Sequence, residues 1–133
     1  MRNIFIALIL TAIPLGAIAQ GADQQLLKVF YRSDCPPCVR EMEIIPEISR
    51  ENNELTIEVI SFDENLTAGP LPATLPLNVH IITMKGKEKE VFDKYGNESM
   101  ALPFSVMLNE DGVCKRHYGI LGTRLIKRWM EAC

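Results

Sequence analysis

Short apolar runs alternate with amphipathic stretches along most of the chain. Residues 26–31 (LLKVFY) and 55–62 (LTIEVISF) are rich in strand-forming side chains, which is typical of buried strands. Between them, residues 36–50 repeat apolar side chains at the spacing of a helix, at Val39, Met42, Ile45 and Ile48. The pattern predicts a β-α-β unit whose strands are parallel and joined by a right-handed crossover.

The middle of the chain predicts a short strand-helix insertion. Residues 63–76 form a loop, because they contain Gly69 and three prolines. Residues 78–83 (NVHIIT) then predict a strand. Residues 87–95 have the spacing of a short charged helix. Its inward-facing side chains are Val91, Phe92 and Tyr95.

The last part of the chain predicts a hairpin followed by a closing helix. Residues 104–108 and 113–118 flank the turn sequence NEDG, whose D-G pair favours an antiparallel hairpin. Residues 121–132 carry apolar side chains at helical spacing. The complete order predicts an α/β fold in which helices flank a mixed central sheet. A single domain over residues 20–133 is expected to contain all of these elements.

The first nineteen residues are predicted to be a signal peptide rather than part of the fold. Arg2 precedes an apolar run over residues 4–13, and the small-x-small pattern at 17–19 suits a signal peptidase. The mature chain is then expected to begin at Gln20 and to be periplasmic or otherwise exported. A retained membrane anchor is the weaker alternative, because the uninterrupted run is shorter than the ~20 residues of a spanning helix.

Charge and composition narrow the classes of partner. The chain of 133 residues has a formal net charge of −3, and loss of Arg2 makes it −4. No basic block is present, so nucleic acid is not an expected partner. The composition is that of an ordinary globular protein.

Two of the four cysteines, Cys35 and Cys38, stand at the start of the first predicted helix in the stretch SDCPPCVRE. This spacing lets the two sulfurs bridge, and it places Cys35 near the free N–H groups and positive dipole end of the helix. A thiolate there attacks a foreign disulfide, and the second cysteine releases the mixed intermediate. A structural disulfide and half of a zinc site remain the alternatives. Zinc needs further ligands, for which no second spaced pair is present.

Two stretches, LLKVFYRSDCPPCVREME and MALPFSVMLNEDG, resemble the thioredoxin-like proteins, and more closely the exported TlpA/ResA-type thiol-disulfide oxidoreductases. The resemblance implies a thioredoxin fold with Cys35 as the attacking and Cys38 as the resolving thiol. It also implies that Pro103 is cis and lies beside the disulfide. Leu102 would then offer backbone groups to an extended substrate segment.

Further site residues come from the same resemblance. Glu41 stands where these proteins carry an acidic residue that assists proton transfer, although a solvated glutamate in the first turn of a helix is the plain alternative. Pro36 and Pro37 lie between the cysteines, suit the entry into a helix and are expected to contact substrate.

Cys114 and Cys133 are expected to form a structural disulfide. Cys114 opens the last predicted strand, and Cys133 ends the last predicted helix, which runs back alongside that strand. The strand rises ~3.3 Å per residue and the helix ~1.5 Å, so the two elements have about the same length and both cysteines lie at one end of the domain. Two free thiols, or a second redox pair that receives electrons from the first, are the rivals.

The expected activity is that of a thiol-disulfide oxidoreductase acting as a protein-disulfide reductase, without a cofactor or a metal. Its partners would be disulfide-containing proteins and a membrane electron donor of the DsbD/CcdA type. A disulfide donor of the DsbA kind and a non-enzymatic module that binds Cu(I) through thiolates are the alternatives. His80 and His117 stand alone in predicted strands and have no assigned role.

Overall fold

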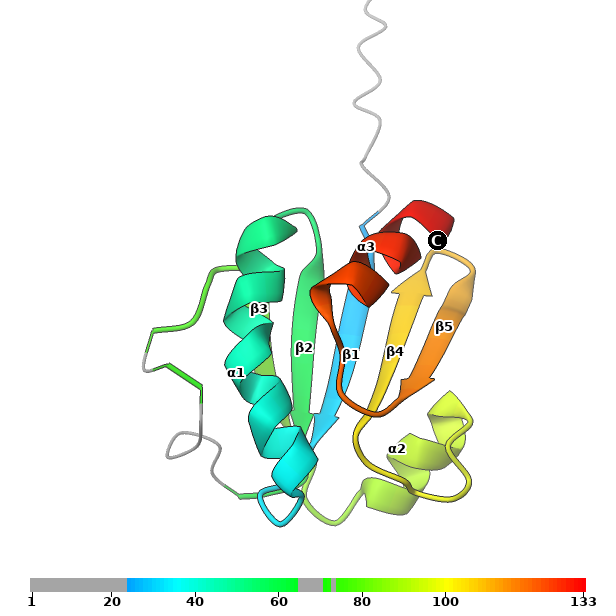
Figure 1. The fold of residues 1–133 in the computed structure, drawn as a ribbon. Coiled ribbons are helices and arrows are strands. Elements are labelled where there is room, and N and C mark those ends of the chain that lie inside the picture. Colours follow the sequence, from blue (N-terminus) through cyan, green and yellow to red (C-terminus); the bar gives the residue numbers. More distant parts are fainter. Residues whose placement is uncertain (1–23, 65–70, 73) are drawn as a thin grey trace, which may run out of the picture.

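A five-stranded sheet with helices on both faces makes up the described part of the chain (Figure 1). The structure, a computed structural model, describes residues 24–64, 71–72 and 74–133. The predicted signal peptide lies outside these residues, as does part of the loop predicted at 63–76. The elements are β1 (Leu26–Tyr31), α1 (Pro36–Glu51), β2 (Thr56–Ser61), β3 (Val79–Thr83), α2 (Glu88–Tyr95), β4 (Phe104–Asn109), β5 (Gly112–Tyr118) and α3 (Thr123–Ala132).

The sheet is mixed, as the sequence predicts. Its strand order is β3-β2-β1-β4-β5. β1 pairs in parallel with β2, and β2 with β3, whereas β4 runs antiparallel to both β1 and β5. The predicted β-α-β unit, insertion and hairpin are therefore confirmed, with β1 at the centre of the sheet.

The last helix begins later than the sequence predicts. Residues 121–132 were expected to be helical, but α3 starts at Thr123. Gly122 has an extended backbone and its carbonyl accepts the first helical hydrogen bonds. Leu121 stays outside the helix, and its side chain is buried. The Leu121 amide donates a hydrogen bond to a side chain of α1.

Two apolar clusters lie on opposite faces of the sheet, because successive strand residues point to opposite sides. From β1, Leu27, Val29 and Tyr31 enter the cluster covered by α1 and α3, whereas Phe30 enters the cluster covered by α2. Trp129 of α3 is buried in the first cluster, and Phe92 and Phe104 are buried in the second. All three aromatic side chains are thus part of the core.

Within the part of the chain that the structure describes, none of the helices has the length and hydrophobicity that a membrane-spanning helix requires.

Candidate active site

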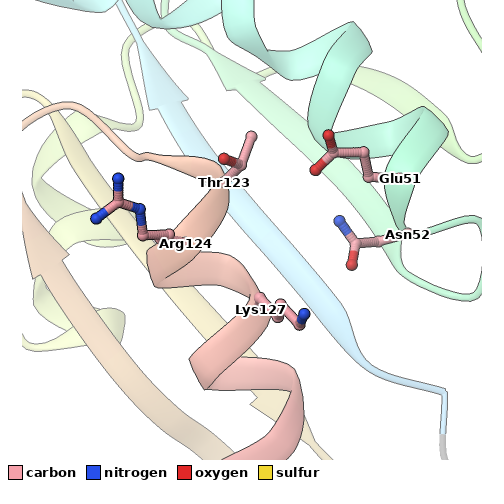
Figure 2. Close-up of a pocket in the computed structure, with 5 residues that line it drawn as sticks. All are labelled: Glu51, Asn52, Thr123, Arg124 and Lys127. Atoms are coloured by element: carbon pink, nitrogen blue, oxygen red, sulfur yellow. The ribbon is translucent and has the colours of Figure 1, made fainter.

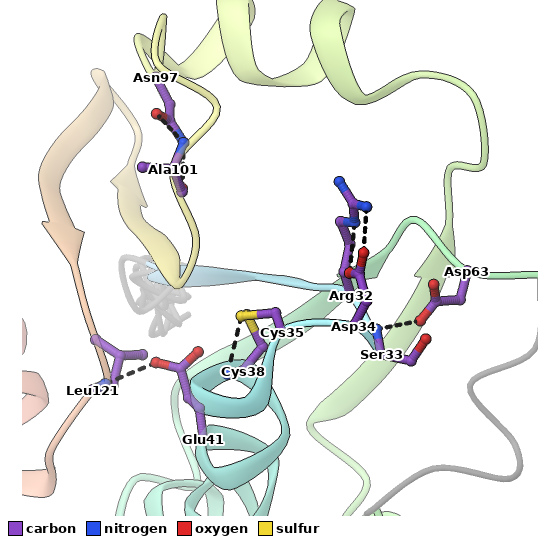
Figure 3. The surroundings of a disulfide bond; sticks show 10 residues. All are labelled: Arg32, Ser33, Asp34, Cys35, Cys38, Glu41, Asp63, Asn97, Ala101 and Leu121. Atoms are coloured by element: carbon purple, nitrogen blue, oxygen red, sulfur yellow. Dashed lines mark hydrogen bonds and ion pairs between the residues drawn. A yellow bond between two sulfur atoms is a disulfide. The ribbon is translucent and has the colours of Figure 1, made fainter.

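Cys35 and Cys38 form a disulfide at the amino end of α1 (Figure 3). The central strand β1 ends at Tyr31, and a short turn leads from it to Cys35, which is the N-cap of α1 with an extended backbone. The Cα atoms of the two cysteines are 5.2 Å apart. The edge of the sheet and the first turn of the helix therefore fix both sulfurs together.

The two sulfurs differ in their access to solvent. Cys38 is fully buried in the cluster beneath α1, whereas Cys35 is only partly buried and packs at the edge of that cluster. Pro36 and Pro37 occupy the first two positions of the helix and have no N–H. The Cys38 amide donates to Cys35 Sγ over 3.3 Å. An incoming reagent thus meets Cys35 first, and a backbone N–H supports negative charge on its sulfur.

Glu41 lies one helical turn beyond Cys38, on the same side of α1. Its side chain is fully buried, and its Oε1 accepts a hydrogen bond from the Leu121 amide over 2.7 Å. Oε2 is buried and has no partner among the described residues. Burial raises the pKa of Glu41 to about 7, although the Leu121 hydrogen bond opposes the shift. The solvated alternative for Glu41 is therefore wrong.

Leu102 and Pro103 reach the same edge of the sheet as the disulfide. Phe104 of β4 is opposite Phe30 of β1, so the residues just before Phe104 lie beside the end of β1 and the turn to Cys35. The Leu102–Pro103 peptide bond is cis. The Pro103 carbonyl accepts a hydrogen bond from the Gly119 amide over 2.9 Å, and Leu102 packs at the edge of the apolar cluster that contains Cys38.

Asn97 is a residue that the sequence analysis did not identify. It is fully buried and closes the loop ahead of Leu102. Its Nδ2 donates to the Ala101 carbonyl over 2.9 Å, and its Oδ1 accepts from the Ala101 amide over 3.2 Å (Figure 3). Met100, inside this loop, has a φ of 54° and is exposed. The only hint in the sequence is a Gly-Asn pair after a helix, which is common in ordinary turns.

A charged rim borders the turn between β1 and α1. Arg32 and Asp34 form an exposed ion pair, with Nη2 and Oδ2 2.7 Å apart. The Ser33 amide donates to Asp63 Oδ2 over 2.7 Å, which ties the turn to the end of β2. Burial, assisted by the charge of Asp63, raises the pKa of Tyr31. The rim fixes the turn, and the carboxylate of Asp34 is paired with Arg32.

Cys114 and Cys133 form the second disulfide, as the sequence analysis expected, with their Cα atoms 6.0 Å apart. Cys114 lies near the start of β5, close to the pair Leu108 and Val113. Leu108 is in turn opposite Leu26, the first residue of β1, whereas Cys35 follows the last. The two disulfides therefore lie toward opposite ends of the sheet.

The histidines do not join either cysteine pair in a metal site. His80 is exposed on the edge strand β3. His117 on β5 meets the ring of Trp129 at its edge, and one ring nitrogen lies 3.4 Å from the Ile120 carbonyl oxygen. Within residues 24–64, 71–72 and 74–133, no group of three or more histidine, cysteine, aspartate or glutamate side chains is arranged to hold a metal.

Surface hollows lie along α3, away from the Cys35–Cys38 disulfide, and two of them are larger than 300 Å³. One, of about 330 Å³, lies between the end of α1 and the start of α3 (Figure 2). It is lined by Glu51, Asn52, Thr123, Arg124 and Lys127. The other, of about 430 Å³, is lined by charged side chains of α3. Neither contains a cysteine or histidine.

Comparison with known proteins supports the fold and the resemblance. No family model matches the chain. The chain is 31% identical over 106 residues to "Thiol-disulfide oxidoreductase ResA" of Halalkalibacterium halodurans, a match that covers 77% of this chain and 58% of that protein. The chain thus spans less than two thirds of the length of this relative.

Two solved structures share the same architecture. StoA from Bacillus subtilis aligns with a TM-score of 0.61 and 21% identity, over 84% of this chain and 85% of that one. A secreted Mycobacterium tuberculosis disulfide oxidoreductase, homologous to DsbE of E. coli, aligns with a TM-score of 0.60 and 13% identity, over 83% and 82%. The predicted thioredoxin fold is therefore confirmed, and so is the resemblance to the TlpA/ResA type.

Proposed function

We propose that this thioredoxin-fold chain is an exported thiol-disulfide oxidoreductase that reduces disulfides in other proteins through Cys35 and Cys38. One observation carries the proposal: a disulfide at the amino end of α1 has one sulfur partly exposed and one fully buried. A structural staple does not need this asymmetry, whereas an exchange reaction does, because one sulfur must meet the substrate and the other must be kept for the second step.

The reaction begins from the reduced chain. The Cys35 thiolate attacks one sulfur of a substrate disulfide, the substrate S–S bond breaks, and the departing substrate thiolate takes a proton. Cys38 then attacks the Cys35 sulfur of the mixed disulfide and expels the second substrate sulfur, which also takes a proton. The substrate gains two electrons and two protons, and the chain is left with the Cys35–Cys38 disulfide.

Glu41 serves the second step by accepting the proton of Cys38. A carboxyl whose pKa is about 7 holds and releases a proton near neutral pH, which a general base requires. The buried Cys38 lies next to it along the helix, and bulk water is excluded from both side chains. The unpartnered Oε2 is the atom available for the transfer.

The substrate segment lies across Leu102 and Pro103 and beside Pro36 and Pro37. Leu102 lies just before β4 and near the disulfide, and its backbone groups pair with the extended substrate segment in this proposal. The oxidised chain then needs two electrons, and a membrane donor of the DsbD/CcdA type supplies them. The secreted M. tuberculosis oxidoreductase of the same fold supports export after cleavage near Ala19.

A disulfide donor of the DsbA kind is the second candidate, because the same two sulfurs serve either direction. A Cu(I)-binding accessory is a third, and only the Cys35–Cys38 pair favours it. The reduction potential separates the first two: the DsbA kind lies near −120 mV, whereas thioredoxin lies near −270 mV. Metal content after purification under reduction tests the third.

Insulin reduction with dithiothreitol tests the activity itself. The wild-type chain should accelerate the precipitation of the insulin B chain, and Cys35→Ser should not. A Cys114→Ser/Cys133→Ser variant is the control, because it removes cysteines elsewhere in the fold and leaves Cys35 and Cys38 in place. Equal rates for Cys35→Ser and wild type would rule out the proposed enzyme.

A further inference from the structure

The two ends of helix α3 lack the features that usually stabilise a helix. It contains ten residues, its N-cap Gly122 provides no side-chain cap, and it has neither acidic residues in its first turn nor basic residues in its last. Caps and complementary end charges each stabilise a helix, and isolated helices shorter than about 12 residues are marginal in water. The position of α3 therefore depends on its contacts with the rest of the fold.

Its carboxyl end is the more firmly attached one. Cys133 is bonded through its sulfur to Cys114 of β5. The Cys133 carbonyl accepts from Asn109 Nδ2 over 3.2 Å, and the Met130 carbonyl accepts from Gln25 Nε2 over 3.0 Å. One covalent bond and two hydrogen bonds thus join the last turn of α3 to β5, to β4 and to Gln25, the residue before β1.

The opposite end of α3 leads directly to the candidate active site. Leu121 lies two residues before the helix, and its amide is the donor that bonds Glu41. The Leu121 side chain is buried in the same cluster as Cys38, together with Ile126 and Trp129 of α3. Figure 3 shows Leu121 beside Glu41, near the sulfurs. α3 therefore spans the distance between one disulfide and the surroundings of the other.

We propose that the Cys114–Cys133 disulfide is a positioning element for the active-site acid: by holding α3 against the sheet, it keeps Leu121 on Glu41 and keeps water away from the carboxyl. Any effect of this coupling between the second disulfide and Glu41 on catalysis rests on the proposed function. Opening this disulfide frees the last turn of α3, and the helix with its weak amino end then moves away from α1. Glu41 loses its hydrogen bond and gains water.

The two losses have opposite effects on Glu41. Loss of the Leu121 hydrogen bond alone raises the pKa of the carboxyl, whereas hydration lowers it. Burial is the larger cause, so hydration prevails and the pKa of Glu41 falls. No charged side chain contributes to the present shift. The cysteines next to Glu41 on α1, Cys35 and Cys38, do not titrate while they form a disulfide, and the segment around Leu121 offers a backbone amide.

A carboxyl titration by carbon-13 NMR tests the coupling without an activity assay. The full chain is compared with Cys114→Ser/Cys133→Ser, both with Cys35 and Cys38 oxidised. In the variant, the midpoint for the Glu41 carboxyl should fall by at least about one pH unit from that of the wild type, toward the range of a solvated glutamate. A midpoint unchanged from the wild type would overturn the proposal, because the second disulfide would then be a staple only.

Two further variants control for general loss of stability. Val91→Ala weakens the apolar cluster on the α2 face and should leave the Glu41 midpoint where it is; an equal fall would overturn the coupling. Two glycines inserted between Ala132 and Cys133 keep the second disulfide but slacken it. This variant should lower the midpoint even if the double serine variant fails to fold, and an unchanged midpoint in it would also contradict the proposal.

The NMR titration and the insulin assay distinguish failure of the coupling from failure of the proposed function. If insulin is not reduced by the wild type but the Glu41 midpoint moves, the coupling stands and the enzyme assignment fails. If insulin is reduced and the midpoint stays, the enzyme assignment stands and the coupling fails. The pH profile of insulin reduction should shift with the Glu41 midpoint when both hold.

Discussion

The two disulfides are the same chemical bond in two different settings. Cys35–Cys38 spans a sequence separation of 3 at the start of a helix, beside a buried carboxyl and near the segment that leads into β4. Cys114–Cys133 spans a sequence separation of 19 and joins the last strand to the end of the chain. Under the proposed function, the surroundings rather than the sulfurs decide which bond exchanges and which one holds.

Loss of the attacking sulfur should give the largest effect and the sharpest contrast. Cys35→Ser should reduce the insulin-reduction rate by roughly a thousandfold, to the background of dithiothreitol alone, because serine does not attack a disulfide under these conditions. Cys114→Ser/Cys133→Ser should keep activity within about tenfold of the wild type at neutral pH. An equal loss of activity in the two variants would contradict the different roles assigned to the two disulfides.

The Cys114–Cys133 disulfide should contribute more to the free energy of unfolding than the Cys35–Cys38 disulfide, although its loss affects activity less. On the loop-entropy estimate, opening Cys114–Cys133 lowers the free energy of unfolding by about 3 kcal/mol, whereas opening the short Cys35–Cys38 loop costs about 2 kcal/mol. Urea unfolding of the two double serine variants measures both values. A larger loss for the Cys35–Cys38 variant would show that the redox pair also staples the fold.

The sequence predicted most of the fold because its apolar patterns are long and its turn signals strong. β1 was assigned to the residue, and the hairpin was assigned from its D-G pair. The start of α3 was placed two residues early, because Leu121 continues the apolar pattern although its backbone has left the helix. Local patterns do not show which amide a distant carboxyl will bind.

The candidate site was predictable only where neighbours in sequence are also neighbours in space. Cys35, Cys38 and Glu41 lie on one helix, so their spacing is informative. The contact between Glu41 and Leu121 joins residues 80 positions apart, and no spacing rule reports it. Asn97 was missed for the same reason: its role follows from burial and from its bonds to the Ala101 backbone.

The contribution of Glu41 to the free energy of unfolding should fall as the pH rises. The pKa of Glu41 is raised from 4.5 to about 7 in the folded chain, so folding favours the protonated carboxyl. This stabilisation is complete below pH 4.5 and is lost as the pH rises through 7. Glu41→Gln should remove it while keeping an acceptor for the Leu121 amide.

Urea unfolding of wild type and Glu41→Gln at pH 5 and pH 8 measures the difference. The variant should gain on the order of 2 to 3 kcal/mol relative to the wild type between these pH values. Glu43→Gln is the matched control on the same helix, because Glu43 is exposed. An equal gain in both variants would show that the effect is not that of the buried carboxyl.

Asn97 should affect substrate binding more than thiol chemistry. Asn97→Ala removes the two side-chain hydrogen bonds that close the loop ahead of Leu102, at a cost of about 1 to 3 kcal/mol in stability, since each hydrogen bond contributes about 0.5 to 1.5 kcal/mol. The KM for a disulfide-bonded protein should rise several-fold, whereas the rate at which iodoacetamide alkylates reduced Cys35 should stay unchanged. A slower alkylation with an unchanged KM would contradict the assignment of this loop to substrate binding.

Trapping of the mixed disulfide tests most directly whether Cys35 is the attacking sulfur. Reduced Cys38→Ser is mixed with a peptide that carries one disulfide, the product is quenched in acid, and the adduct is located by mass spectrometry of the fragments. The account predicts that one peptide sulfur is bonded to Cys35 and that Cys114 and Cys133 remain joined to each other. An adduct on Cys114 or Cys133, or none on Cys35, would contradict it.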